Sequence, residues 1–536
     1  MADRVILWTH AKIPNSNESV PLTWQVSTSS TFDTVVASGS VTSTANTAFT
    51  SKVDATGLSA GNTYYYRFVD ALRNASAVGV TRTLPAGNAA SVKFAVFSCA
   101  LYSAGYFNVY DDAAKSGAQY AIHLGDYIYE FGSAPSTFGS ADAKALGRVM
   151  APANDIVSLE DYRTRYALYR SDPDLQALHA AMPWITVWDD HEFASNAWVD
   201  GSDNHNSATQ GNWSARKAIA ARVYHEWMPI RAPDASNLLK IYRRFDFGNI
   251  FTLHMLDTRI EGRDRQYDSH GDVDRGVARY ASALSSGADA NHRMMSTIQQ
   301  HWLTSGVAAS TAAWQILGNQ DIMARMWFPA KVIQAAFTAV TSPTAANQQA
   351  VQKSVVDYLT AKTAHATVRT AAQADLVSAT ANPRLPYNMD AWDGYPTQRE
   401  TILQAIKAQG KKLIALSGDS HNAWFANLTT QAGETVGVEF AGASVTSPGF
   451  ESMGLSALAS SLDGTALVPG VQGNGMGLVE DVNYADTTRR GYLLMTATSA
   501  SVKGEFVFVD TVQSKTFVAA TGKTVTVATT GAITYA

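Results

Sequence analysis

The sequence predicts an α/β fold preceded by a smaller all-β module. From residue 92 onward, short apolar strands alternate with helical stretches, which is the pattern of an α/β sheet. Before residue 90 only strand patterns occur, separated by Gly, Asn and Ser turns. Since 536 residues exceed one ordinary core, we expect two domains, over about residues 1–90 and 91–536.

The first module is expected to be a β-sandwich. β-Forming residues recur in four segments, Val5–His10, Val20–Ser27, Thr34–Val41 and Thr63–Val69. Leu58, a turn at Gly61 and the tyrosines that follow match one corner of a fibronectin type III-like sandwich. The segment Thr81–Ala90 is then the linker to the second module.

The second module alternates strands and helices. The expected strands are Val92–Ser98, Tyr120–Gly125, Trp184–Trp188, Ile250–Leu256, Trp314–Leu317 and Lys412–Ser417. The clearest helices are Val109–Ser116, Asp161–Tyr169, Ser214–Trp227, Ser296–Val307 and Gln398–Gln409. An Ala/Thr/Gln-rich stretch at about 330–390 is expected to form a helical insert, as a lid or a lateral subdomain. Further strands over about 491–536 are expected to extend a sheet edge.

Composition excludes several functions. Charged residues make up 16% and the net charge is -5, so we expect no stable binding of nucleic acid. No apolar run reaches the roughly 18 residues of a membrane helix, so no transmembrane anchor is expected. Cys99 is the only cysteine, which excludes an intrachain disulfide. No signal peptide precedes the first strand, which predicts a cytosolic protein or an exported one whose signal was replaced by a start codon.

Polar residues follow four of the apolar strands, where open α/β sheets place their sites. The first is Cys99, and a thiolate there suits iron or zinc. The alternative is an inert buried cysteine. The second is Asp126 with Tyr129, because a carboxylate can bridge two cations and a phenolate stabilises a trivalent ion. A helix-capping Asp and a core Tyr are the alternative.

The third motif is Asp189, Asp190, His191 and Glu192, directly after a strand. Such crowding of like charge is costly unless cations or hydrogen bonds offset it. We therefore expect Asp190, with Asp189 as a further candidate, to bind metal. His191 is expected to face the substrate as a proton donor or oxyanion partner, oriented by Glu192. The alternative is an exposed polar loop.

The fourth motif is Asp419 and His421, after the last of these strands. Because the two residues alternate in phase, both are expected to point to one side, and an Asp-x-His pair is an ordinary ligand set. A turn Asp beside a surface His is the alternative. Each motif alone is weak evidence for a metal site. All four, however, follow apolar strands of the same module, which a random distribution of these residues along the chain would not produce.

In this order, the motifs resemble the alkaline phosphatase D (PhoD-like) family of the metallophosphatase superfamily. Further matching stretches are Phe193–Trp198, Glu226–Arg231, Leu256–Arg259, Leu317–Gln320 and Ser444–Pro448. The resemblance covers nearly the whole chain. It implies a four-layered αββα core, a site holding iron(III) with calcium, hydrolysis of phosphomonoesters and phosphodiesters, and export. We therefore expect a periplasmic or secreted protein, and a monomer.

The resemblance also suggests a ligand set. Purple acid phosphatases share the Gly-Asp-x-x-Tyr motif but have Asp, Asn and His where this chain has Cys99, Asp190 and Asp419. The added carboxylates favour a harder second cation such as calcium. We expect Cys99, Asp126, Tyr129 and His421 to hold the iron. Asp126 would bridge to a calcium bound by Asp190 and Asp419, with Asn319 and Asn196 as further candidate ligands.

In the expected reaction on a small phosphoester, a metal-bound hydroxide attacks phosphorus in line with the leaving alkoxide. His191 assists the leaving group or the equatorial oxygens. Arg259 is a candidate phosphate clamp, because a guanidinium matches phosphate geometry. The alternative is that Arg259 pairs with Asp257 or another carboxylate.

Two other functions fit parts of the sequence. Gly418, Asp419 and Ser420 resemble the nucleophile block of Gly-Asp-Ser esterases, with Ser420 as nucleophile. Those enzymes place the block near the N-terminus and a catalytic His far downstream, whereas His421 is the last His of this chain. The other alternative is a non-enzymatic, exported binding protein whose sandwich and insert contact polymers.

Overall fold

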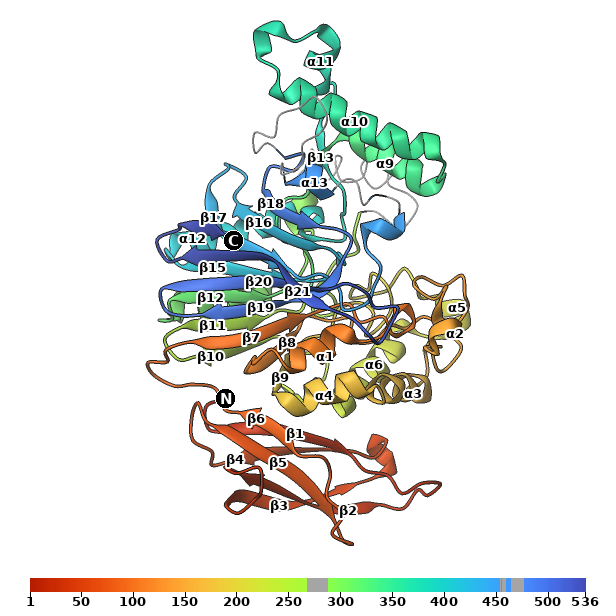
Figure 1. Cartoon of the computed structure of the whole chain (residues 1–536), viewed down its shortest axis with the longest axis vertical. Coiled ribbons are helices and arrows are strands. Elements are labelled where there is room, and N and C mark those ends of the chain that lie inside the picture. The colour runs from red at the N-terminus through yellow and green to blue at the C-terminus, as the bar shows by residue number, and fades with distance from the viewer. Residues whose placement is uncertain (268–287, 454, 456–458, 464–476) are drawn as a thin grey trace.

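The N-terminal module is a small β-sandwich at one end of the molecule (Figure 1). The computed structural model describes residues 1–267, 288–453, 455, 459–463 and 477–536. One sheet pairs β1 (Arg4–His10) with β4 (Thr50–Thr56). The other has the order β3 (Val35–Ser43), β2 (Val20–Ser27), β5 (Thr63–Asp70) and β6 (Gly79–Arg82). Alternate residues of both sheets, such as Leu7, Val26 and Phe68, form its buried core.

The remainder of the chain is built on two seven-stranded sheets. The first has the order β10 (Arg243–Phe247), β11 (Phe251–Met255), β12 (Trp314–Gly318), β15 (Lys412–Ser417), β17 (Thr435–Ala441), β16 (Ala423–Thr429) and β18 (Val482–Asp486). The second has the order β22 (Ile533–Tyr535), β21 (Ala519–Ala528), β20 (Ser501–Val509), β19 (Arg490–Ala497), β7 (Val92–Phe97), β8 (Tyr120–His123) and β9 (Trp184–Thr186). Strands β11, β12, β15 and β17 are parallel, as are β7, β8 and β9, so their carboxyl ends meet at common edges.

Aromatic side chains fill the space between the two sheets. The ring of Phe94 on β7 lies 5.5 Å from that of Phe251 on β11, and Phe440 on β17 lies 6.1 Å from Phe506 on β20. Gly504 leaves room for this contact, because a Cβ atom there would lie 2.4 Å from the Phe440 ring.

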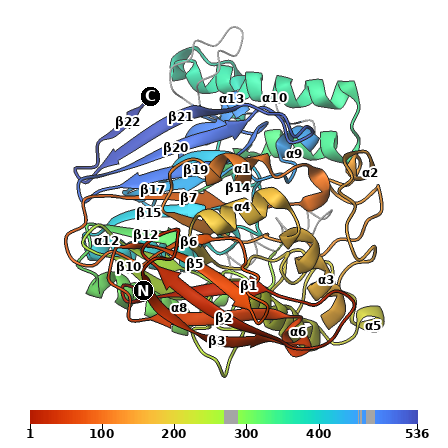
Figure 2. The ribbon, with the colours of Figure 1, turned by 60° about the horizontal axis from the view of Figure 1, so that its bottom comes forward.

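Helices cover the outer faces, which gives the predicted αββα layering. On the side of β7–β9 lie α1 (Asn108–Ala114), α3 (Leu159–Arg170), α4 (Pro173–Ala181) and α6 (Trp213–Trp227), as Figures 1 and 2 show. The other sheet carries α8 (Thr297–Ala309) and α12 (Pro396–Ala408), and α12 packs against β17. Short helices α2 (Ala143–Leu146), α5 (Ser207–Gln210) and α13 (Ala459–Leu462) lie in connecting segments.

A helical arm projects from the core at the end opposite the sandwich (Figure 1). It consists of α9 (Ala330–Thr341), α10 (Ala345–Thr363) and α11 (Ala371–Leu376). Its base is closed by antiparallel pairing of β13 (Trp327–Pro329) with β14 (Arg384–Pro386). Among the described helices, none combines the length and apolar character needed to cross a bilayer.

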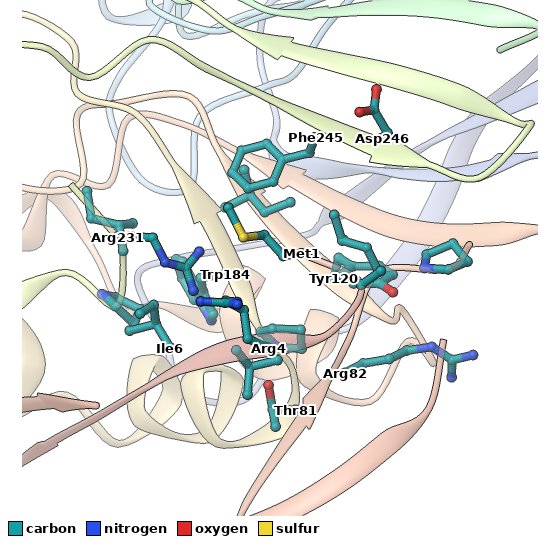
Figure 3. A pocket seen from close by; sticks show the side chains of 18 of the residues that line it. Met1, Arg4, Ile6, Thr81, Arg82, Tyr120, Trp184, Arg231, Phe245 and Asp246 are labelled. Carbon is teal, nitrogen blue, oxygen red and sulfur yellow. The ribbon is translucent and has the colours of Figure 1, made fainter. Parts of the chain in front are cut away.

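The sandwich is joined to the core by specific contacts. Trp8 donates a hydrogen bond to the carbonyl of Glu226 at 3.0 Å, and the Arg170 guanidinium lies 4.0 Å from the centre of the Trp8 ring. Arg231 forms a two-pronged ion pair with Asp54. A cavity of about 820 Å³ remains between the two parts (Figure 3).

Candidate functional site

The predicted site residues meet at the ends of β7, β8 and β15. Five of them have positive φ, namely Cys99 at 61°, Asp126 at 55°, Asn196 at 51°, Asp419 at 56° and His421 at 60°. Such backbone is costly for residues other than Gly and is typical of functional sites. The expected alternation of Asp419 and His421 along a strand is wrong, because β15 ends at Ser417 and both residues lie in the turn that follows.

A first group of candidate ligands consists of Cys99, Asp126 and His421, whose ligand atoms all lie within 4.8 Å of one another. Tyr129 lies beside them, since its hydroxyl is 2.9 Å from Oδ2 of Asp126 and 3.2 Å from Nε2 of His421. Ser447 adds a hydroxyl 2.7 Å from that of Tyr129. The structure therefore brings together all four residues that were expected to hold iron.

His421 is oriented so that one nitrogen faces this group. Its Nδ1 atom lies 2.8 Å from the carbonyl oxygen of Pro448, so Nδ1 carries the proton and donates it there. The lone pair of Nε2 then points toward Tyr129 and the other ligands. Burial lowers the pKa of His421 to about 3, which keeps the ring neutral, as a metal ligand must be.

The pKa values of the acidic members of this group are all raised, which disfavours their charged forms. Burial, together with the charge of Asp126, raises the pKa of the Cys99 thiol well above its usual range. Burial likewise raises the pKa of the Tyr129 phenol and of the Asp126 carboxyl. A cation among these groups would reverse all three shifts, because it favours each charged form.

A second group joins the first through Asp126. Ligand atoms of Asp126, Asp190 and His191 also lie within 4.8 Å of one another. Oδ1 of Asp126 and Oδ1 of Asp190 are buried without a hydrogen-bond partner among the described residues, an arrangement that costs free energy unless a cation is bound. The donor set and these oxygens therefore fit metal ions, with Asp126 placed to bridge two of them.

His191 is oriented by Glu130 rather than by Glu192, so that part of the sequence prediction is wrong. Nδ1 of His191 lies 2.6 Å from Oε2 of Glu130. Although burial opposes it, the charges of Asp190, Glu130 and Asp126 raise the pKa of His191 well above its usual value. These three carboxylates therefore favour the imidazolium form of His191.

Glu192 instead stabilises the loops that carry the ligands. Its carboxylate accepts backbone N–H groups of Asp126, Tyr127, Ile128 and Asp189 at 2.5–3.3 Å. It therefore ties the loop after β8 to the loop after β9.

Arg259 lies among carboxylates, as one of the sequence alternatives anticipated. It donates to Asp189 at 2.5 Å, to Asp390 at 2.6 Å and to Asp419 at 3.0 Å, and Asp321 lies 2.9 Å away. Asp257 accepts only its backbone N–H. Because the guanidinium is fully buried and its donors are engaged, its position does not suit the predicted role of phosphate clamp.

The carboxylates around Arg259 make two further candidate cation groups. Asp189, Asp190 and Asp419 form one, and Asp321, Asp390 and Asp419 the other. Burial raises the pKa of Asp419 to about 8 although Arg259 opposes the shift. The sequence prediction included Asp189, Asp190 and Asp419 but missed the other two acids.

The two asparagines proposed as further ligands have other contacts. Oδ1 of Asn319, the atom that would bind a cation, accepts a hydrogen bond from Trp392 at 3.0 Å. One of the two lone pairs of this oxygen is therefore already engaged, and Asn319 stays a predicted ligand. Asn196 has a φ of 51° and donates its backbone N–H to Asp190 at 2.5 Å, while its side-chain amide donates to Asp203.

Several residues of the site were missed by sequence reasoning. Glu130 stands directly after Tyr129, and Asp321 directly after the matched stretch that ends at Gln320, so both could have been suspected. Ser447 lies within a matched stretch as well. Asp390 carries no local signal, since it lies at the end of the insert and reaches the site only through folding.

The site opens into a cavity of about 780 Å³. Asp190, His191, Asp419 and His421 line one part of it, and α9 of the arm lines another. A phosphoester could therefore reach the second group of ligands from this cavity.

Two family models match this chain. Residues 94–506 match the family model of PhoD-like phosphatases, and residues 1–85 match that of their N-terminal domain. Alkaline phosphatase D of Bacillus subtilis (strain 168) is 31% identical over 464 residues, or 84% of this chain and 68% of that protein. A solved structure described as "Structure of PhoD" has a TM-score of 0.75 at 28% identity, covering 100% of this chain and 90% of that one.

Proposed function

Because this chain belongs to the PhoD-like phosphatase family and is a phosphoric ester hydrolase, we propose that it cleaves phosphomonoesters and phosphodiesters at a centre of iron(III) and calcium. One observation carries the proposal: Cys99, Asp126, Tyr129 and His421 converge from separate segments on one buried point, and Asp126 faces a second acidic group.

The two groups suit different cations. Thiolate, phenolate, imidazole and carboxylate from Cys99, Tyr129, His421 and Asp126 suit iron(III). The carboxylates of Asp189, Asp190 and Asp419 form an oxygen-rich group that suits calcium, and Asp190 also belongs to the group that contains Asp126. When bound, these cations would neutralise charge on the phosphoryl oxygens and lower the pKa of the attacking water.

His191 is the proposed proton donor. Its charged ring lines the cavity, held by Glu130 on the Nδ1 side, with Nε2 4.0 Å from Asp190. As the P–O bond breaks, the Nε2 proton would pass to the leaving alkoxide, and the neutral ring would remain.

Arg259 is proposed as a positioning residue. Its guanidinium spans Asp189, Asp390 and Asp419, so it fixes the relative placement of carboxylates from three segments. This arrangement offsets part of the repulsion among them.

The esterase alternative lacks support at Ser420. Its hydroxyl accepts a hydrogen bond from Trp424 at 2.9 Å, while the ring of His421 is bonded to Pro448 and Tyr129. A nucleophilic Ser requires a base within hydrogen-bonding reach. Export to the periplasm or medium and a monomeric state remain predictions from the family resemblance.

The test is turnover of 4-nitrophenyl phosphate and bis(4-nitrophenyl) phosphate by the purified protein. We expect both to be cleaved, EDTA to inhibit and Ser420→Ala to retain activity. On an alkyl phosphate, whose alkoxide leaving group needs a proton, His191→Gln should reduce kcat by about 100-fold or more. Activity that survives metal removal and disappears in Ser420→Ala would contradict the proposal.

A further inference from the structure

Two kinds of side chain line the cavity that contains His191 and Asp190. Carboxylates and histidines are among the lining residues. Apolar residues line it as well, including Phe328 of β13, Phe450 and residues of the helix α9. A pocket with a few polar groups among mostly apolar walls is typical of sites that bind an organic group by burial.

Helix α9 presents a continuous apolar stripe to this cavity. Val332, Ile333, Ala336, Phe337 and Val340 line it, and their spacing places them on one face of the helix. The polar residues of the helix, Lys331, Gln334, Thr338 and Thr341, are not among the residues that line the cavity.

Several apolar side chains of this cavity remain exposed in the structure. Phe138 and Val340 are each 40% exposed and Met453 is 39% exposed, although all three line the same space. Phe138 also stacks on the ring of His421, with centroids 5.9 Å apart. The apolar surface is therefore continuous with the metal-binding residues, and exposed apolar surface beside a reactive site indicates a ligand that covers it.

The charge of the cavity excludes polyanionic organic groups. Among the described residues that line it there is no Lys or Arg, whereas Asp190, Asp203, Asp390 and Asp419 are present. Cations at the site would neutralise one phosphoryl group, but a second phosphate farther along the cavity would find no Lys or Arg among the described lining residues, which there are apolar, acidic or neutral and polar. Sites for polyphosphorylated groups normally supply Arg or Lys.

We propose that the substrates are phosphoesters whose organic group is uncharged and apolar, an alkyl chain or an aryl ring, and that α9 binds this group. The inference rests on the proposed phosphoesterase function and specifies its substrate class. A volume of about 780 Å³ admits a chain of several carbons in addition to the phosphoryl group.

The experiment measures kcat/KM on n-alkyl 4-nitrophenyl phosphates from methyl to octyl, below their micellar concentrations. Alkyl alcohol and nitrophenolate release are both followed. We expect kcat/KM to rise by about two- to fourfold for each added methylene that is buried, so that octyl exceeds methyl by more than about tenfold. A series that is flat to within about twofold overturns the inference.

Two variants test whether the apolar stripe of α9 binds the organic group of the substrate. Phe337→Ser and Val340→Thr should each lower the octyl-to-methyl ratio by about threefold or more, because each removes apolar surface from the stripe. The control Val368→Ser changes a residue of the same arm that is 71% exposed and does not line the cavity, so the ratio should be unchanged. A ratio that stays high in both stripe variants places the apolar group elsewhere and overturns the inference.

A further experiment distinguishes soluble from membrane-borne substrates. The octyl ester is compared with an octadecyl 4-nitrophenyl phosphate carried in phosphatidylcholine vesicles, and faster cleavage of either identifies the source of the apolar ester. Cleavage of bis(4-nitrophenyl) phosphate with no chain-length preference refutes this inference but leaves the proposed function intact. Failure to cleave any phosphoester refutes the proposed function itself.

Discussion

Nδ1 of His191 lies 2.6 Å from Oε2 of Glu130, a residue 61 positions earlier in the chain. The second carboxylate oxygen of Glu130 accepts hydrogen bonds from the backbone of Ser195 and from Asn204 at 2.7 and 2.8 Å. Glu130 is therefore fixed on both sides and holds the imidazole at the edge of the ligand cluster.

The first prediction distinguishes the roles of Glu130 and Glu192, the two glutamates beside the site. Glu130→Gln keeps a hydrogen-bond acceptor for His191 but removes the charge that favours the imidazolium, so kcat should fall by roughly tenfold or more with little change in metal content. Glu192→Gln should lower the free energy of unfolding instead, by roughly 2 kcal/mol, because its carboxylate accepts four buried backbone N–H groups.

Steady-state kinetics, elemental analysis and urea denaturation of both variants test this assignment. The reverse result, with a large loss of kcat only in Glu192→Gln and a loss of stability only in Glu130→Gln, would restore Glu192 as the residue that orients His191.

Arg259→Lys is the second prediction. Lys keeps the positive charge but cannot reach Asp189, Asp390 and Asp419 together, so the free energy of unfolding should fall by about 3 kcal/mol. Competitive inhibition by inorganic phosphate should change little. A variant of unchanged stability whose inhibition constant for phosphate rises by about tenfold would show that Arg259 is a phosphate clamp after all.

The sequence was most informative about site residues that stand close to a predicted strand in the chain. Cys99, Gly125–Tyr129 and Asp189–His191 each follow an apolar strand at once, so strand periodicity alone was enough to place them at one sheet edge. The sandwich and the α/β class followed from strand and helix patterns, whereas the αββα layering was implied by the family resemblance. The short helices α2 and α5 carry too few residues for periodicity to be detected.

The remainder of the site depends on contacts that are distant in the chain. Asp390 reaches Arg259 across 131 positions, and no local pattern specifies that pairing. Glu130 and Glu192 both stand beside predicted ligands, so sequence could not decide which of them contacts His191. That choice depends on the direction of each side chain in the folded structure, where Glu130 contacts His191 and Glu192 accepts backbone N–H groups.

The third prediction concerns stability at acid pH. Burial lowers the pKa of His254 to about 4, and the same group titrates near 6.5 in an unfolded chain. Between these two pKa values His254 is protonated in the unfolded state but not in the folded state. The free energy of unfolding is therefore highest above pH 6.5, where His254 is neutral in both states, and it falls as the pH decreases toward 4. For this residue it amounts to roughly 2 kcal/mol between pH 7 and pH 5.

His254→Gln, which retains a donor for Gln315, should therefore flatten the decline in the free energy of unfolding between pH 7 and pH 5. His301→Gln is the control, because His301 is exposed on α8, and it should leave the decline unchanged. Equal slopes for the wild type and both variants in urea titrations would contradict the assignment.

The most direct test is the visible absorption spectrum of the purified protein, recorded with its iron content. Iron(III) bound by a phenolate and a thiolate gives a charge-transfer band. We predict that Tyr129→Phe abolishes or strongly shifts it and that Cys99→Ala reduces bound iron. Tyr127→Phe, whose hydroxyl contacts His179 instead, should leave the band unchanged. A colourless protein without iron that hydrolyses phosphoesters at full rate would contradict the proposed centre.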